Sequence, residues 1–113
     1  MDKKSLSALQ DFQADKFTKR IAFQKGESVV FVLNFMPGQE LPSHRHPGTD
    51  VYLLGLTGSG TITVDGAKTA FAEGDILHLE GNEEFGFIND GSEPASLYVI
   101  LTKIPEPRYA ENI

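Results

Sequence analysis

The sequence predicts a small all-β protein, a barrel or jelly roll, on the strength of three observations. Short segments with strand-like apolar periodicity recur along the chain, and glycine or proline separates them. No convincing amphipathic helix interrupts this pattern. The chain has 113 residues, which is enough to bury one core but too few for two domains. About eight short strands can close into a barrel just wide enough for one small ligand.

Turns with residues that favour a positive φ join the expected strands. The strands cover residues 17–23, 28–35, 50–57, the hairpin 61–71, and then 76–79, 85–88 and 95–102. Gly26 joins the first two strands as a hairpin, and the pair Asp65-Gly66 has the composition of a type I′ turn. Pro37 ends the second strand, because proline has no N–H to donate to a sheet ladder.

The segments outside the expected barrel are short. We assign residues 1–16 to an N-terminal arm, residues 17–104 to the barrel and residues 105–113 to a C-terminal tail. The apolar residues between Leu6 and Phe12 predict one helical turn or an irregular arm. The prolines at positions 105 and 107 predict an extended or loose tail.

Composition and charge limit the partners and the location. The formal net charge is −6 and the 10 basic residues are scattered, which argues against nucleic acid or an anionic membrane as a partner. No apolar run is long enough to span a membrane, and the start lacks the apolar core of a signal peptide, so we expect a cytoplasmic location. The absence of cysteine excludes disulfides and thiolate chemistry.

The residues that carry chemistry lie just before the strand 50–57. In an extended chain His44, His46 and Asp50 share parity and can point to one side, while Arg45 points away. Two imidazoles and one carboxylate form a facial ligand set that suits Fe, Mn, Ni or Zn and leaves coordination positions open. The competing interpretation is that the two histidines are exposed polar residues of a loop.

The spacing of these residues resembles a known family motif. Gly38, five residues, His44, one residue, His46, three residues and the acid Asp50 resemble the first motif of the cupins, whose acid is normally glutamate. This intact His-x-His pair carries most of the resemblance at the candidate site.

A second segment is similar to the second cupin motif, and it consists of Gly66, residues 74–79 and residues 85–89. The resemblance covers roughly residues 31–101 and implies a single-domain cupin, with a double-stranded β-helix or jelly-roll barrel and a metal in its mouth. It also implies a homodimer. In bacterial members of this size the first residues lie against the partner subunit, which suits the apolar residues of the arm.

The sequence departs from the cupin pattern in four ways. Asp50 is one methylene shorter than the usual glutamate, and one residue more than the pattern allows separates it from Gly58; a β-bulge at Gly55 would absorb that residue. Glu80 replaces the proline of the second motif. Phe85 stands where the third histidine ligand is expected, so at most three of the four usual ligands remain.

Aromatic residues and a third histidine complete the predicted ligand pocket. Phe85 and Phe87 share parity and are expected to face the lumen, and Tyr52 shares parity with Asp50. Ordinary core filling is the competing interpretation of these rings. His78 is a substitute ligand, an acid–base residue or a partly exposed strand residue.

An acidic cluster, Glu80, Glu83 and Glu84, lies at a turn beside the second motif. One of its carboxylates could complete a metal shell, and a solvated loop is the alternative.

The sequence is compatible with three functions. The first is a metal-dependent cupin acting on a small organic molecule, as a dioxygenase or an isomerase. The second is a metal-free, non-catalytic cupin that binds or senses a small molecule. The third is a metal-bearing but catalytically idle domain whose surface serves dimerisation. The missing fourth ligand favours binding and the intact histidine pair favours catalysis, so the sequence does not decide whether the protein is an enzyme.

Overall fold

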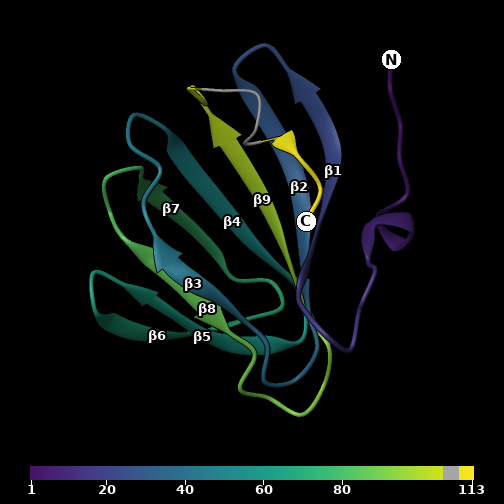
Figure 1. Ribbon diagram of the computed structural model, residues 1–113, viewed down its shortest axis with the longest axis vertical. Helices are drawn as coiled ribbons and strands as arrows, with labels where there is room; N and C mark the ends of the chain where they lie inside the picture. Colours follow the sequence, from purple (N-terminus) through teal and green to yellow (C-terminus); the bar gives the residue numbers. More distant parts are fainter. Residues whose placement is uncertain (106–109) are drawn as a thin grey trace.

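Two β-sheets face each other and make up the body of the protein (Figure 1). The computed structural model describes residues 1–105 and 110–113. Its elements are η1 (Leu6–Leu9), β1 (Thr18–Lys25), β2 (Ser28–Phe35), β3 (Glu40–His44), β4 (Asp50–Thr57), β5 (Ser59–Val64), β6 (Ala67–Ala72), β7 (Ile76–Glu80), β8 (Phe85–Ile88) and β9 (Ala95–Thr102). The larger sheet has the order β1-β2-β9-β4-β7 and the smaller one β3-β8-β5-β6, with antiparallel neighbours throughout. The predicted all-β jelly roll is confirmed.

The core lies between the sheets, where alternate side chains of the strands point inward. In β2 these are Val29, Phe31, Leu33 and Phe35, each no more than 5% exposed. The Phe35 ring lies 4.9 Å, centroid to centroid, from that of Phe87 in the opposite sheet. Since burying one such side chain stabilises the fold by about 1.5–3 kcal/mol, these contacts hold the two sheets together.

Two predicted local features are present in the strands that frame the site. Asp65 and Gly66 have φ values of +48° and +84°, as a type I′ turn requires at both central positions. The register of β4 with β9 shifts between Gly55 and Thr57, so the pairing is irregular directly after Gly55, where a β-bulge was expected. A Cβ at Gly55 would lie 2.1 Å from the carbonyl oxygen of Ala72, and only glycine fits this close approach.

The strand β3 was not predicted as a separate strand. It contains Pro42, which has no N–H to donate, and its side chains are largely exposed, so it lacks the alternation that marks a half-buried strand. It tolerates proline because it is the first strand in the order of the smaller sheet and pairs only with β8 among the described strands. This edge strand ends at His44 and so delivers the first histidine to the candidate site.

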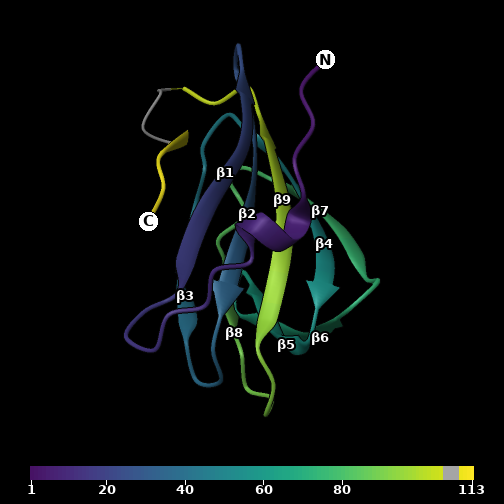
Figure 2. The same ribbon diagram turned by 90° about the vertical axis from the view of Figure 1, so that its right-hand side faces the viewer.

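The N-terminal arm lies on the outer face of the larger sheet, where η1 crosses β2 and β9 (Figure 2). Asn34 donates a hydrogen bond of 2.8 Å to the carbonyl oxygen of Leu9, and Arg20 forms an ion pair of 2.6 Å with Asp11. Residues 9–12 of the arm are therefore partly buried on the chain's own barrel, and packing of the arm on a partner subunit stays a prediction. No helix in the described residues is long and apolar enough to cross a membrane.

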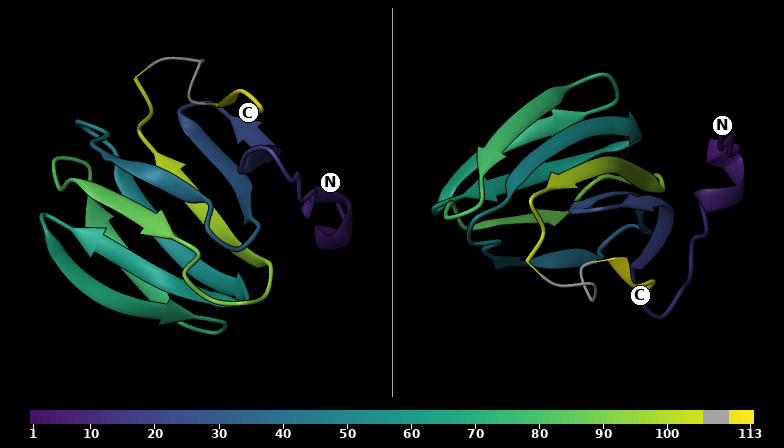
Figure 3. Two further views of the ribbon diagram at one scale, coloured as in Figure 1. Left: turned by 60° about the horizontal axis from the view of Figure 1, so that its bottom comes forward. Right: turned by 90° about the horizontal axis from the view of Figure 1, so that it is seen from above.

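The C-terminal residues return to the barrel beside β1 (Figure 3). Lys19 N–H donates to the main-chain oxygen of Ile113 at 3.0 Å, and Ile113 N–H donates to that of Lys19 at 3.1 Å. The predicted loose tail falls partly on residues 106–109, which lie outside the described residues. Its last residue is held by the edge of the sheet.

Candidate functional site

His44 and His46 converge at one end of the space between the sheets. Their Nε2 atoms are 3.2 Å apart. His44 Nδ1 lies 2.8 Å from the carbonyl oxygen of Pro42, and because a carbonyl oxygen only accepts, Nδ1 carries the proton of this ring. His44 Nε2 therefore presents a lone pair toward His46, as a ligand-binding imidazole does.

His46 is held in its neutral form. Burial lowers the pKa of His46 to about 4, and electrostatic interactions with His44 and Lys19 lower it further. A neutral imidazole is the form that binds a metal or accepts a hydrogen bond, so no proton has to leave His46 at neutral pH.

A small cavity of about 80 Å³ opens beside the two histidines. At about 30 Å³ per water molecule, it has room for two or three waters or a ligand of that size. Its polar lining consists of His44, His46 and Lys19, and the other lining residues are apolar. Phe85 forms one wall, with its ring centroid 5.3 Å from that of His44 and 5.7 Å from that of His46.

Lys19 is a site residue that the sequence did not suggest. Its Nζ lies 4.4 Å from the centroid of the Phe31 ring, and burial lowers the pKa of Lys19. The alternation of side chains along β1 could have placed Lys19 on the inner face. It could not have shown that this edge of the barrel lies next to the histidines.

Asp50 does not join the histidines. Its Oδ1 accepts a hydrogen bond of 3.2 Å from His78 Nε2, and its Oδ2 lies 3.4 Å from Lys103 Nζ. The bond from His78 lowers the pKa of Asp50, and Lys103 lowers it further. Within the described part of the chain, no group of three His, Cys, Asp or Glu side chains could hold a metal ion.

A turn between His46 and Asp50 explains why the parity argument fails. Gly48 has a φ of +83°, and Thr49 N–H donates a bond of 3.0 Å to the carbonyl oxygen of His46. The chain is therefore not extended between the two predicted ligands, and alternation of side chains cannot be counted across it. The expectation that residues 44, 46 and 50 share one face is corrected.

Val51, the neighbour of Asp50 in β4, faces inward. It is 1% exposed and pairs in register with Leu79 of β7 and Leu101 of β9. The distance in sequence from Val51 to Gly58 fits the cupin motif, whereas the distance from Asp50 is one residue too long. This extra residue already indicated that position 51, and not 50, faces inward. Valine cannot bind a metal, and the site therefore keeps two imidazoles.

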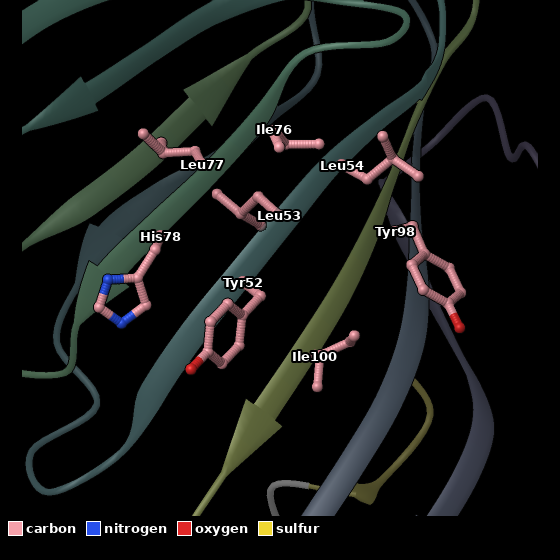
Figure 4. Close-up of a pocket in the computed structure, with 8 residues that line it drawn as sticks. All are labelled: Tyr52, Leu53, Leu54, Ile76, Leu77, His78, Tyr98 and Ile100. Carbon is pink, nitrogen blue, oxygen red and sulfur yellow. The ribbon is translucent and has the colours of Figure 1, made fainter.

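The remaining predicted pocket residues lie in two other places. Phe87 packs against Phe35 in the core. Tyr52 and His78 are on the outer face of the larger sheet, with ring centroids 4.9 Å apart. Figure 4 shows both beside Ile76 and Tyr98, where they line an open hollow of about 490 Å³. Neither Tyr52 nor His78 lines the cavity of the two histidines.

The acidic cluster also lies apart from the histidines. Glu84 forms an exposed ion pair of 3.2 Å with Arg45, and Glu83 accepts a hydrogen bond of 2.8 Å from the backbone N–H of Glu80. These contacts stabilise a turn at the surface and supply no carboxylate to the cavity.

The two antiparallel sheets and the histidine pair at one end of the space between them define a small jelly-roll barrel protein. Residues 31–101 match the family model described as "Cupin domain", and the chain belongs to the cupin family. The helix-poor architecture and the position of His44 and His46 agree with this assignment.

Solved structures place most of the chain within that fold, and one curated relative matches about half of it. The TT1209 protein of Thermus thermophilus superposes with a TM-score of 0.87 at 26% identity, covering 93% of this chain and 100% of the other. An RmlC-like cupin of Desulfovibrio desulfuricans gives 0.83 at 21% identity, covering 92% and 98%. The dimethylsulfoniopropionate lyase DddW of Ruegeria pomeroyi is 37% identical over 62 residues, which are 55% of this chain and 40% of that protein. This chain therefore matches less than half the length of that curated relative.

Proposed function

We propose that the mouth of this cupin barrel binds a divalent transition metal through Nε2 of His44 and Nε2 of His46, with Fe, Mn, Ni and Zn as candidates. The separation of 3.2 Å between these atoms carries the proposal. Metal–imidazole bonds are about 2.0–2.1 Å long, so two nitrogens bound to one ion cannot lie more than about 4.2 Å apart. The fixed tautomer of His44 and the neutral form of His46 support it further.

The fit is partial, because the positions of the other two usual ligands hold Val51 and Phe85. When bound, the metal would supply a Lewis acid with several open positions. His44 and His46 would hold it, and the Phe85 ring would exclude water from one side of the cavity. Such a centre suits a small organic ligand, with oxygenation or isomerisation as the reaction classes. The lyase activity in the name of the Ruegeria relative adds elimination to these classes.

Metal content tests this proposal. Untagged protein is incubated with Fe(II), Mn(II), Ni(II) or Zn(II), desalted and assayed by elemental mass spectrometry. We expect close to one ion per chain in the wild type and in His78→Ala, the matched change on the outer face, and none in the double variant His44→Ala/His46→Ala. No metal in the wild type with any of the four ions would refute the proposal.

A metal-free barrel that binds a small organic anion is the second candidate, and Lys19 favours it. The Lys19 side chain lines the same cavity as His44 and His46. The Lys19 ammonium can donate charge-assisted hydrogen bonds to a carboxylate, and the single N–H of neutral His46 can add another. The cavity of about 80 Å³ admits an anion the size of acetate rather than a large metabolite.

Acetate separates the two candidates. Chelator-treated protein is titrated with acetate, and the histidine ring resonances are followed by NMR. The anion-binding candidate predicts saturable shifts that Lys19→Met removes, while metal content is unaffected by that substitution. The metal candidate predicts that acetate acts only after metal has been added.

We propose that a second copy of the chain covers the outer face of the larger sheet. Ile76 is 79% exposed and Tyr52 is 44% exposed, and both border the open hollow of about 490 Å³. A surface that carries both a protruding side chain and a hollow can pair with itself about a two-fold axis. The N-terminal arm already lies over part of this face, so β9, β4 and β7 remain to be covered. Three strands about 4.8 Å apart and about eight residues long outline roughly 380 Å². A stable interface needs about 800 Å² per partner, so the N-terminal arm would contribute the rest.

Sedimentation velocity tests the dimer. We expect the wild type to sediment as a dimer and Ile76→Glu to sediment as a monomer, while Glu73→Lys, a change at an exposed turn, leaves the dimer intact. A monomeric wild type at high protein concentration would refute this proposal.

A further inference from the structure

The last residues of the chain form part of the wall of the histidine cavity. The segment Ala110–Ile113, here the C-terminal strap, lies along the free side of β1 (Figure 3). Ile113 and Lys19 exchange both backbone hydrogen bonds, as a hydrogen-bonded pair of antiparallel strands does. The backbone N–H of Ile21 donates a bond of 2.8 Å to the side-chain oxygen of Asn112, which here replaces a strand carbonyl.

The side chain of Ile113 reaches the cavity itself. It lines the same space as His44, His46 and Phe85, although about half of the residue (49%) remains exposed. Ala110, at the other end of the strap, packs against the hydrophobic core. Through Ile113 the strap therefore contributes part of the cavity's wall.

Arg20 holds the strap in place and is itself held by the N-terminal arm. Its Nη1 donates a bond of 2.8 Å to the main-chain oxygen of Ile113. Its Nε and Nη2 donate bonds of 3.1 Å and 2.6 Å to Oδ2 of Asp11. One guanidinium thus joins both terminal segments to β1, and its planar fork suits such simultaneous contacts better than a lysine ammonium would.

We infer that the C-terminal strap controls access to His44 and His46, with Ile113 as the residue that limits the size of an incoming molecule and Arg20 as the positioning residue. A few hydrogen bonds at the edge of a sheet hold the strap, so it opens far more often than the barrel strands do. A molecule larger than the cavity reaches the histidines only while the strap is open. The statement about ligand size rests on the proposed function, whereas the statement about access does not.

Diethyl pyrocarbonate, a small reagent that acylates neutral imidazoles, measures that access directly. The chain has three histidines, and cleavage after Lys25, Arg45, Lys68 and Lys103 places each of them on its own tryptic peptide. Mass spectrometry of the full-length, chelator-treated protein then gives a separate modification rate for each residue. His78 lies on the outer face and serves as the internal reference in the wild type and in the variants that leave that face unchanged.

Three variants are compared with the wild type. Ile113→Gly removes the side chain that lines the cavity but keeps the backbone bonds, and Arg20→Lys keeps the charge but loses the fork. Ile76→Gly removes an isoleucine from the outer face and is the matched control. We expect the rates at His44 and His46 to rise about threefold to thirtyfold in the first two variants, as the loss of one or two modest interactions allows. The rate at His78 stays constant in both, and Ile76→Gly leaves the two cavity histidines unchanged.

Equal rates at His44 and His46 in the wild type, Ile113→Gly and Arg20→Lys would overturn the inference. A rise at all three histidines would do so as well, because it would report general unfolding. Repeating the measurement with Zn(II) separates this inference from the proposed metal site. Protection of His44 and His46 by zinc tests the metal proposal, and the ratio of variant to wild-type rates without zinc tests the strap.

Discussion

The two faces of β4 show how one residue of register divides the predicted site in two. Val51 points into the hydrophobic core between the sheets, whereas its neighbours Asp50 and Tyr52 point out to solvent. The inner face holds two imidazoles in a cavity of about 80 Å³, and the outer face holds His78 and Asp50 beside an open hollow of about 490 Å³. Because side chains alternate along a strand, an error of one position along β4 transfers the predicted carboxylate ligand to the opposite face.

The largest expected difference between the two faces of β4 is the loss of folding stability caused by a glutamate on each face. Val51→Glu places a charge at a position that is 1% exposed, and we expect a loss of about 3 to 5 kcal/mol in the free energy of unfolding of the metal-free protein. Asp50→Glu, the adjacent change on the outer face, is expected to change it by about 0.5 kcal/mol or less. Urea denaturation of both variants makes the comparison.

Adding metal should increase the difference in behaviour between Val51→Glu and Asp50→Glu. In Val51→Glu, Zn(II) or Mn(II) should restore much of the lost stability, because a third ligand would then face His44 and His46. The same ions should raise the unfolding free energy of Asp50→Glu by no more than they raise that of the wild type. If Asp50→Glu were as damaging as Val51→Glu, the assignment of inner and outer faces would be wrong.

The pH dependence of stability should also distinguish the faces. The pKa of His46 is lowered to about 4, so between that pH and the ordinary value of 6.5 the unfolded chain binds a proton that the folded chain does not. Stability of the metal-free protein therefore falls as the pH drops from 6.5 to 4. We expect about 2 kcal/mol to be lost over this window, after a discount for the partial exposure of the ring.

Substitution identifies the residue responsible for this slope. His46→Gln should flatten the curve of unfolding free energy against pH between 4 and 6.5, and His78→Gln, on the outer face, should retain it. A slope that survives His46→Gln would assign the effect to other groups, for example the carboxylates.

Most of the fold could be predicted from the sequence, and the reasons are local. The strand β2 is an almost continuous apolar run, β9 alternates over most of its length, and the turn Asp65-Gly66 specifies its own geometry. None of these three features needs tertiary information. The strand β3 was missed because an edge strand with a proline and exposed side chains carries no periodic signal. The pairing of Ile113 with Lys19 joins residues 94 positions apart in the sequence, and nothing in either segment encodes the partner.

The site was predictable only in part, for a related reason. His44 and His46 lie two residues apart, so their convergence follows from local geometry at the end of β3. The placement of Asp50 depended on the turn at Gly48, whose positive φ breaks the alternation on which the prediction relied. Lys19 reaches the cavity from a strand in the other sheet, and such a long-range neighbour cannot be derived from spacing.

The smallest expected effect concerns the metal rather than the fold. Phe85 contacts both imidazoles, so Phe85→His would place a third imidazole on the inner face. We expect this variant to bind Zn(II) or Ni(II) at least about tenfold more tightly than the wild type, which corresponds to about 1.4 kcal/mol. Tyr52→His makes the same change on the outer face and should leave the affinity unaltered. Competition with a chromophoric chelator measures both affinities. An equal gain in the two variants would show that the added histidine binds metal by itself, without His44 and His46, and the inner face would then lose its distinction from the outer one.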